Sequence, residues 1–102
     1  MWFAWDPAKS ETNLEERGFD FEFELATLIF NGPTVEVEDR RRDYRERRMV
    51  AIGLADGVHL TVVHTDRHAP DGLHRRIISA RRSNRREQGI YSATTTGHSG
   101  TE

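Results

Sequence analysis

The sequence of 102 residues has the length of one domain, and its 35% hydrophobic and 31% charged residues predict one compact core beneath a heavily charged surface. The absence of cysteine excludes a disulfide scaffold, a cysteine-ligated zinc and a thiol nucleophile. No apolar run approaches the ~20 residues that cross a bilayer, and the apolar start at residues 1–5 is too short for a signal peptide, so we expect a cytoplasmic protein, with a formal net charge of −2.

The first third of the chain predicts a short strand followed by two helices. The aromatic run over residues 2–5 is typical of a strand. A helix is expected over residues 7–17, because Asp6 is a good N-cap and Pro7 suits the first helical position. A second helix is expected over residues 21–30, where apolar side chains recur four residues apart and form a wide face. This face is either core packing or an aromatic stripe for a partner.

The middle of the chain predicts three strands. Residues 34–38 alternate between apolar and polar side chains, as a half-buried strand does. The charge run over residues 39–48 is either a solvated loop or an RNA contact. Residues 49–55 and 58–65 are expected to form a hairpin, because the Asp56-Gly57 pair between them suits a type I′ turn. Because side chains alternate along a strand, three residues of each strand lie on one face: Val50, Ile52 and Leu54 on the first, and Leu60, Val62 and His64 on the second.

The last third predicts a loop, a strand, a helix and a tail. Residues 67–74 are polar and contain turn-forming residues, which favours a loop. A strand that is buried at its centre is expected over residues 76–80, a short basic helix over 81–91, and a disordered tail over 92–102. The single domain therefore covers residues 1–91. Its order predicts an α+β fold with a mainly antiparallel sheet, whose helices cover one face and leave the other for solvent or a ligand.

The small net charge conceals a polarised sequence. Residues 1–39 carry two basic and ten acidic side chains, whereas residues 40–91 carry thirteen arginines and six acidic side chains. Only Lys9 among the fifteen basic residues is not an arginine, and the planar arginine fork suits bidentate binding of phosphate. The two halves either neutralise each other within the fold or indicate a nucleic-acid contact.

The densest group of arginines surrounds the last expected strand, over residues 75–87. A helix that begins at Arg81 would place Arg81 beside Arg85 and Arg82 beside Arg86. Like charges at that spacing repel each other, and the start of a helix attracts phosphate. A bound phosphate or an acidic partner would relieve this repulsion; alternatively, these arginines pair with the acidic first half of the chain.

A set of short motifs runs in one order along residues 3–91. The matching pieces are Trp5-Asp6 with Lys9 and Asn13, Arg17-Gly18-Phe19-Asp20-Phe21, Ala26 with Ile29-Phe30, Gly32-Pro33-Thr34, Asp43-Tyr44 with Glu46, Ala51-Ile52-Gly53, Val62-Val63-His64-Thr65-Asp66-Arg67, Arg76-Ile77-Ile78-Ser79-Ala80-Arg81, and Asn84 with Glu87 and Tyr91. In this order the set resembles the BrnT family, the toxin component of a type II toxin–antitoxin system with the antitoxin BrnA. The resemblance implies a compact RelE-like fold and a ribonuclease that lowers translation. It also implies neutralisation by a ribbon-helix-helix antitoxin, with promoter DNA bound only through the antitoxin complex.

Cleavage of RNA without a metal ion needs a base for the 2′-hydroxyl, cations beside the developing phosphorane and an acid for the 5′-oxygen. The five histidines form no metal-binding pattern and the chain has no glycine-rich phosphate loop, so we expect no metal and no other cofactor. Arg67, Arg76 and Arg81 are the expected phosphate clamps. Lys9 would join them if its helix packs beside the edge of the sheet.

The proton carriers are harder to choose from the sequence. Either Glu87 or His64 is the base or the acid, unless Glu87 only pairs with an arginine and His64 is a structural histidine. Tyr44 and Tyr91 either stack on a base or pack within the fold. The residues expected to bind RNA are Arg82, Arg85, Arg86 and Tyr91.

A second class of function uses the same arginines. A binding module that holds RNA or an antitoxin without cutting, such as an inactive relic of a toxin, would have the same charge pattern. Cleavage of RNA in the presence of a chelator separates the two readings, because a binding module shifts RNA in a gel without cutting it.

Overall fold

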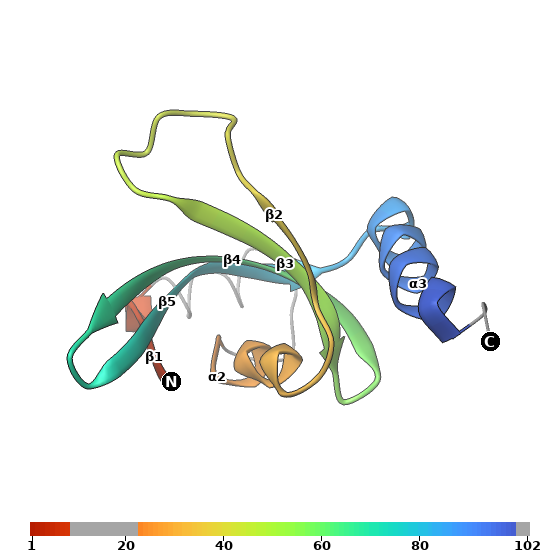
Figure 1. Cartoon of the computed structure of the whole chain (residues 1–102), viewed down its shortest axis with the longest axis horizontal. Helices are drawn as coiled ribbons and strands as arrows, with labels where there is room; N and C mark the ends of the chain where they lie inside the picture. The colour runs from red at the N-terminus through yellow and green to blue at the C-terminus, as the bar shows by residue number, and fades with distance from the viewer. Residues whose placement is uncertain (9–22, 100–102) are drawn as a thin grey trace.

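A computed structural model describes residues 1–8 and 23–99 of the chain, with side chains through residue 95. Its centre is a single five-stranded sheet with the strand order β1-β5-β4-β3-β2 (Figure 1). The strands are β1 (Trp2–Trp5), β2 (Val35–Glu38), β3 (Arg48–Ala55), β4 (Val58–Ala69) and β5 (Gly72–Arg82). Every neighbouring pair is antiparallel except β1 with β5, which is parallel. The expected α+β class with a mainly antiparallel sheet is confirmed.

The described helices are α2 (Phe23–Ala26), the 3₁₀ helix η1 (Thr27–Asn31) and α3 (Arg85–Ser99). They range in length from four residues in α2 to fifteen in α3. The helix expected over residues 21–30 is thus helical where it is described, but it tightens to a 3₁₀ turn after Ala26. Most of the helix expected over residues 7–17 lies outside the described residues; at its start, the Asp6 side chain accepts the expected capping hydrogen bond from the Ala8 N–H at 3.0 Å. None of the described helices is long and apolar enough to span a membrane.

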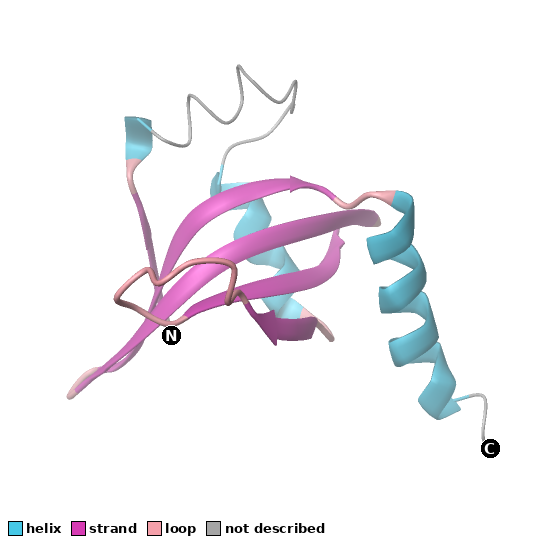
Figure 2. Ribbon diagram, turned by 90° about the horizontal axis from the view of Figure 1, so that it is seen from above, coloured by secondary structure: helices cyan, strands magenta, loops and turns pink. Residues whose placement is uncertain are grey.

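The sheet has two different faces, which we call the covered face and the open face. The covered face packs against α2 and η1, and α3 lies at one end of the molecule against the opposite side (Figure 2). The core lies on the covered face and contains Phe23, Ala26, Ile29, Ala51, Ala55, Leu60, Val62, Ile77 and Ala80. Because side chains alternate along a strand, residues Val50, Ile52 and Leu54 of β3 lie on the open face.

Small residues in β3 let η1 approach the sheet closely. A Cβ atom added at Gly53 would lie 2.8 Å from the Cβ of Ile29, closer than two carbon atoms can pack. Gly53 pairs with Leu60, and Ala51 pairs with Val62, so the large side chains on this face come from β4. Glycine at this position therefore serves packing rather than a turn.

The two hairpins of β4 differ in how well the sequence indicates them. The Asp56-Gly57 turn is confirmed, with φ angles of 51° and 80° that fit a type I′ turn. The loop expected over residues 67–74 is wrong: β4 continues to Ala69 and pairs with Gly72 across a two-residue turn. The result is a long two-stranded arm (Figure 1). Both faces of such an arm contact solvent, so its polar composition resembles that of a loop.

The expected boundaries at the C-terminal end also need correction. Residues 81 and 82 belong to β5, and α3 begins at Arg85 after a capping box, in which the Asn84 side chain accepts the Glu87 N–H at 2.8 Å and Glu87 accepts the Asn84 N–H at 2.9 Å. The helix then continues through residues 92–99, where a disordered tail was expected. The Thr95 hydroxyl donates a 2.7 Å hydrogen bond within this helix.

Candidate functional site

Three of the expected phosphate clamps share the open face. Arg67, Arg76 and Arg81 pair across the sheet with His74, Thr65 and Thr61. Alternation along β4 places Thr61, Thr65 and Arg67 on one side. Arg76 and Arg81 are five residues apart, so in a regular strand they would point to opposite faces. A register shift opposite Val63 and His64 adds one residue to β5 and brings them to the same face. Lys9 lies outside the described residues.

A cavity lies at the base of the arm, where β1, β4 and β5 meet, and it is lined by side chains of opposite charge. It is lined by Ala4, Glu46, Thr65, Asp66, Arg67, His74, Arg75 and Arg76. Cations, carboxylates and an imidazole therefore surround one space. This set contains each kind of group that cleavage of RNA through the 2′-hydroxyl requires.

Glu46 lies between two arginines in this cavity. Both of its oxygens accept hydrogen bonds from Nη2 of Arg76, at 3.0 and 3.1 Å, and Nε of Arg48 donates to Oε2 at 3.0 Å. The side chain of Arg76 is 55% exposed, and exposed ion pairs contribute only ~0–1 kcal/mol. An incoming phosphate can therefore exchange with Glu46 for Arg76 at little cost.

His74 is the imidazole of the cavity. Its Nε2 lies 2.7 Å from Oδ1 of Asp71, and its ring stacks against Trp2 with centroids 6.3 Å apart. The hydrogen bond from His74 lowers the pKa of Asp71, so Asp71 remains a carboxylate that orients the ring.

Arg81 and Glu87 form an ion pair at the start of α3. Two guanidinium nitrogens of Arg81 donate to the two Glu87 oxygens, at 2.6 and 2.7 Å. The bond from Arg81 lowers the pKa of Glu87, and the bond to Glu87 raises the pKa of Arg81. The anion expected at this helix start is therefore Glu87 itself. The expected rows of Arg81 with Arg85 and Arg82 with Arg86 are wrong, because Arg81 and Arg82 lie on a strand.

His64 is fully buried and is not positioned to carry a proton to a substrate. Its Nε2 lies 2.8 Å from Glu36, its Nδ1 lies 2.9 Å from Asp66, and the edge of its ring meets Phe30. Asp66 also accepts two hydrogen bonds from Arg75, at 2.8 and 2.7 Å. Burial opposes ionisation of Asp66, but the bonds and charges of Arg75 and His64 outweigh it and lower its pKa. This network joins β2, β4 and β5 beneath the cavity.

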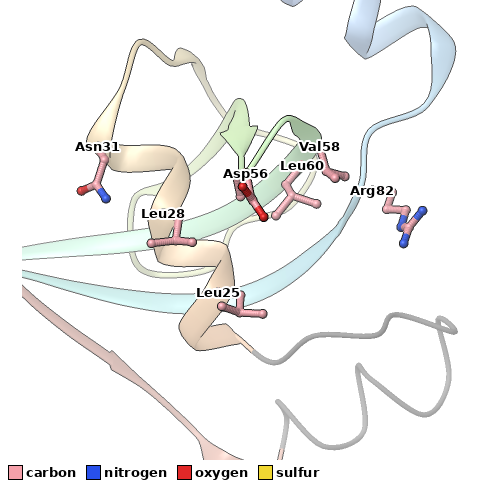
Figure 3. A pocket seen from close by; sticks show the side chains of 8 residues that line it. Leu25, Leu28, Asn31, Asp56, Val58, Leu60 and Arg82 are labelled. Carbon is pink, nitrogen blue, oxygen red and sulfur yellow. The ribbon is translucent and has the colours of Figure 1, made fainter.

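The remaining residues expected to bind RNA are dispersed. Arg82 borders an apolar groove on the covered side, between Leu25 and Leu28 on one flank and Val58 and Leu60 on the other (Figure 3). Arg85 and Arg86 are exposed on α3.

Tyr91 packs inside the fold. It is buried, its hydroxyl donates a 3.0 Å hydrogen bond to the Pro33 carbonyl, and its ring meets His59 edge to face. This burial leaves no ring face for a base, so the expected stacking role is wrong.

The sequence does not single out Glu46, His74 and Arg75 of this cavity as site residues. Glu46 stands in a mixed charge run that resembles a solvated loop, and His74 stands in the segment expected to be a loop. Arg75 was not distinguished from its neighbour Arg76, although only Arg75 is buried. The arm has one signal in the sequence, which is an alternating pattern on both sides of a two-residue turn. The residues that carry it are Asp66, Arg67, His74, Arg75 and Arg76. No group of three or more His, Asp or Glu side chains in residues 1–8 and 23–99 is placed to hold a metal ion.

Comparison with known families identifies the chain. A family model described as "Ribonuclease toxin, BrnT, of type II toxin-antitoxin system" matches residues 5–87, which is most of the chain. The chain therefore belongs to the BrnT family, a family of ribonuclease toxins of type II toxin–antitoxin systems, and the resemblance seen in the sequence is confirmed. A search of curated proteins finds no match.

Proposed function

We propose that this member of the BrnT family is an endoribonuclease that cleaves RNA at the cavity of the open face without a metal ion. One observation carries the proposal: Glu46, His74, Arg67 and Arg76 line the same space. A carboxylate, an imidazole and two guanidinium groups supply a base, an acid and two cations.

In the proposed reaction the 2′-oxygen attacks the adjacent phosphorus and the bond from phosphorus to the 5′-oxygen breaks. Glu46 accepts the proton of the 2′-hydroxyl, and protonated His74 donates a proton to the leaving 5′-oxygen. The products are a 2′,3′-cyclic phosphate and a 5′-hydroxyl. Arg76 leaves Glu46 and, together with Arg67, binds the phosphate as its negative charge increases. This exchange both frees the base and places the cations.

The other basic residues extend the proposed RNA path rather than the reaction centre. Arg81 lies on the same face as Arg76. Arg85 and Arg86 continue the basic surface onto α3. We include Lys9 on the resemblance to the family alone. Because Glu87 is committed to Arg81 and to the helix cap, we no longer propose it as a proton carrier.

Cleavage of RNA in a chelating buffer tests the proposal. Glu46→Gln and Arg76→Ala should each reduce the cleavage rate by about 10²- to 10⁴-fold. Arg40→Ala is the matched control, because Arg40 is 82% exposed and pairs with Glu38. Wild-type rates in both test variants, with the fold intact by circular dichroism, would contradict the assignment of the cavity.

A second function is favoured by the ion pairs of the site. Arg76 and Arg81 are each paired with a glutamate, as suits a module that binds RNA or an antitoxin without cutting. Such a module shifts RNA in a gel at every chelator concentration and leaves it intact. Cleavage that Arg76→Ala abolishes excludes this alternative.

We further propose that the toxin lowers translation and that a BrnA-type ribbon-helix-helix antitoxin neutralises it by covering the open face. This face carries Val37 at 60% exposure and Leu54 at 40%, as well as the arginines. Val37→Glu should therefore remain toxic on expression and escape the antitoxin, whereas Leu25→Ala, on the covered side, should still be neutralised. Growth with and without the neighbouring gene is the measurement. Equal neutralisation of both variants would place the antitoxin elsewhere.

A further inference from the structure

Trp2 is a large aromatic residue that the fold leaves in water. It begins β1 at the edge of the sheet, and it is 56% exposed. Burying an aromatic side chain of this size is favourable, so the exposed ring offers apolar area to a ligand of the neighbouring cavity. Its neighbour in the chain, Phe3, points to the other side of the sheet and stacks on Phe30.

The indole makes two contacts with the arm. Its Nε1–H donates a 3.3 Å hydrogen bond to the Asp71 carbonyl in the turn of the arm. One side of the ring lies against His74, with an angle of 29° between the two planes. The exposed remainder of the ring is thus held in a set direction, which lowers the entropy that a stacking partner must overcome.

The register of β1 places this ring next to the proposed reaction centre. Trp2 pairs with His74, and Ala4 pairs with Arg76. Trp2 and Ala4 lie on the same face, about 6.6 Å apart along the strand. Ala4 lines the cavity and carries only a methyl group, so no tall side chain of β1 stands between the indole and Arg76.

We propose that Trp2 is a stacking platform for one unpaired nucleobase of the RNA, next to the phosphate held by Arg67 and Arg76. This inference rests on the proposed ribonuclease function. Phosphate binds the guanidinium groups, and the adjoining base covers the indole, because every base offers an aromatic face. A base inside a duplex has no free face, so the platform selects single-stranded segments.

The test uses the full chain and a single-stranded RNA oligonucleotide with 2′-O-methyl groups, which removes the nucleophile and separates binding from cleavage. Affinity is measured by fluorescence anisotropy for the intact oligonucleotide and for a series with one abasic position each. Wild type should lose about 5- to 150-fold in affinity at one abasic position. Trp2→Ala should bind the intact RNA more weakly by that factor and be insensitive to the same abasic position. Trp2→Phe should retain most of the affinity.

Leu25→Ala is the control for loss of an exposed apolar side chain, because Leu25 is 48% exposed on the covered side. It should bind RNA like wild type. The inference is overturned if Trp2→Ala binds as wild type does, or if it remains sensitive to the same abasic position. If the Trp2 inference is overturned but wild type cleaves unmodified RNA, the ribonuclease proposal still stands. If wild type neither binds nor cleaves RNA, both the ribonuclease proposal and the Trp2 inference are wrong.

Discussion

Glu87→Gln is the substitution that separates a structural role of Arg81 from a catalytic one. It removes the charge that accepts two bonds of 2.6 and 2.7 Å from Arg81. Hydrogen bonds to charged groups contribute ~1.5–3 kcal/mol and exposed pairs ~0–1 kcal/mol. Arg81 is 37% exposed and Glu87 is 15% exposed, so we expect the free energy of unfolding to fall by about 1–2 kcal/mol at pH 7. A domain of this size then loses roughly 4–16 °C in Tm.

The pH dependence of this loss carries a definite sign. The pKa of Glu87 is lowered in the folded protein, so the charged form favours folding. Its contribution is complete above the unfolded pKa of about 4.5 and is lost as the pH falls through the folded value. Urea unfolding followed by circular dichroism should therefore show a gap between wild type and Glu87→Gln at pH 7 that closes in acid. Asn84→Ala is the control, because its cap bond is uncharged and its cost of ~1 kcal/mol is independent of pH.

Two results would refute this account. A gap between wild type and Glu87→Gln that is equal at pH 7 and pH 3 would show that the charge does not stabilise the fold. A cleavage rate of Arg81→Ala that falls as far as that of Arg76→Ala, at a temperature where the variant is folded, would return Arg81 to the reaction centre.

Three further outcomes follow from packing and hydrogen bonding. Gly53→Ala should lower the free energy of unfolding by ~1–3 kcal/mol through overpacking against Ile29. Gly32→Ala is the control and should change it little, because no atom lies within 4 Å of the new Cβ. Equal melting temperatures of the two variants would contradict this prediction. Tyr91→Phe should cost ~0.5–1.5 kcal/mol in a urea titration, because a main-chain carbonyl loses its partner, and an unchanged midpoint would count against it. Asp39→Asn should speed tryptic cleavage of the loop over residues 40–47, because the buried carboxylate accepts four hydrogen bonds from Arg41 and Tyr44 of that loop; unchanged cleavage would show that the loop is held by other contacts.

The parts of the fold that the sequence indicates are those with strong local signals. The Asp56-Gly57 turn requires positive φ at both residues, and the apolar spacing over residues 21–30 requires a helical face. The arm has no such signal, because polar residues on both of its faces hide the alternation of a strand. The start of α3 was misplaced for a similar reason: arginines suit a strand end and a helix start equally, and only the Asn84–Glu87 pair fixes the boundary.

The candidate site was predictable in part. The number and placement of the arginines indicate those of the open face. Their common face depends on a register shift opposite Val63 and His64, and the sequence of a single strand does not indicate such a shift. Glu46 approaches Arg76 across thirty residues of chain, through pairing of β3 with β4 and of β4 with β5. Long-range pairings of this kind are a property of the whole sheet, so no local motif indicates the proton carriers.

The parallel pairing of β1 with β5 determines when the site can form during synthesis of the chain. It joins the first residues of the chain to residues 74–77, while the cavity draws on Ala4 as well as Arg76. Domains are synthesised from the N-terminus and fold as units when their long-range partners emerge. A chain still on the ribosome with its last strand unmade has neither the pocket nor the platform of Trp2. The nuclease we propose therefore cannot act before β5 has been made.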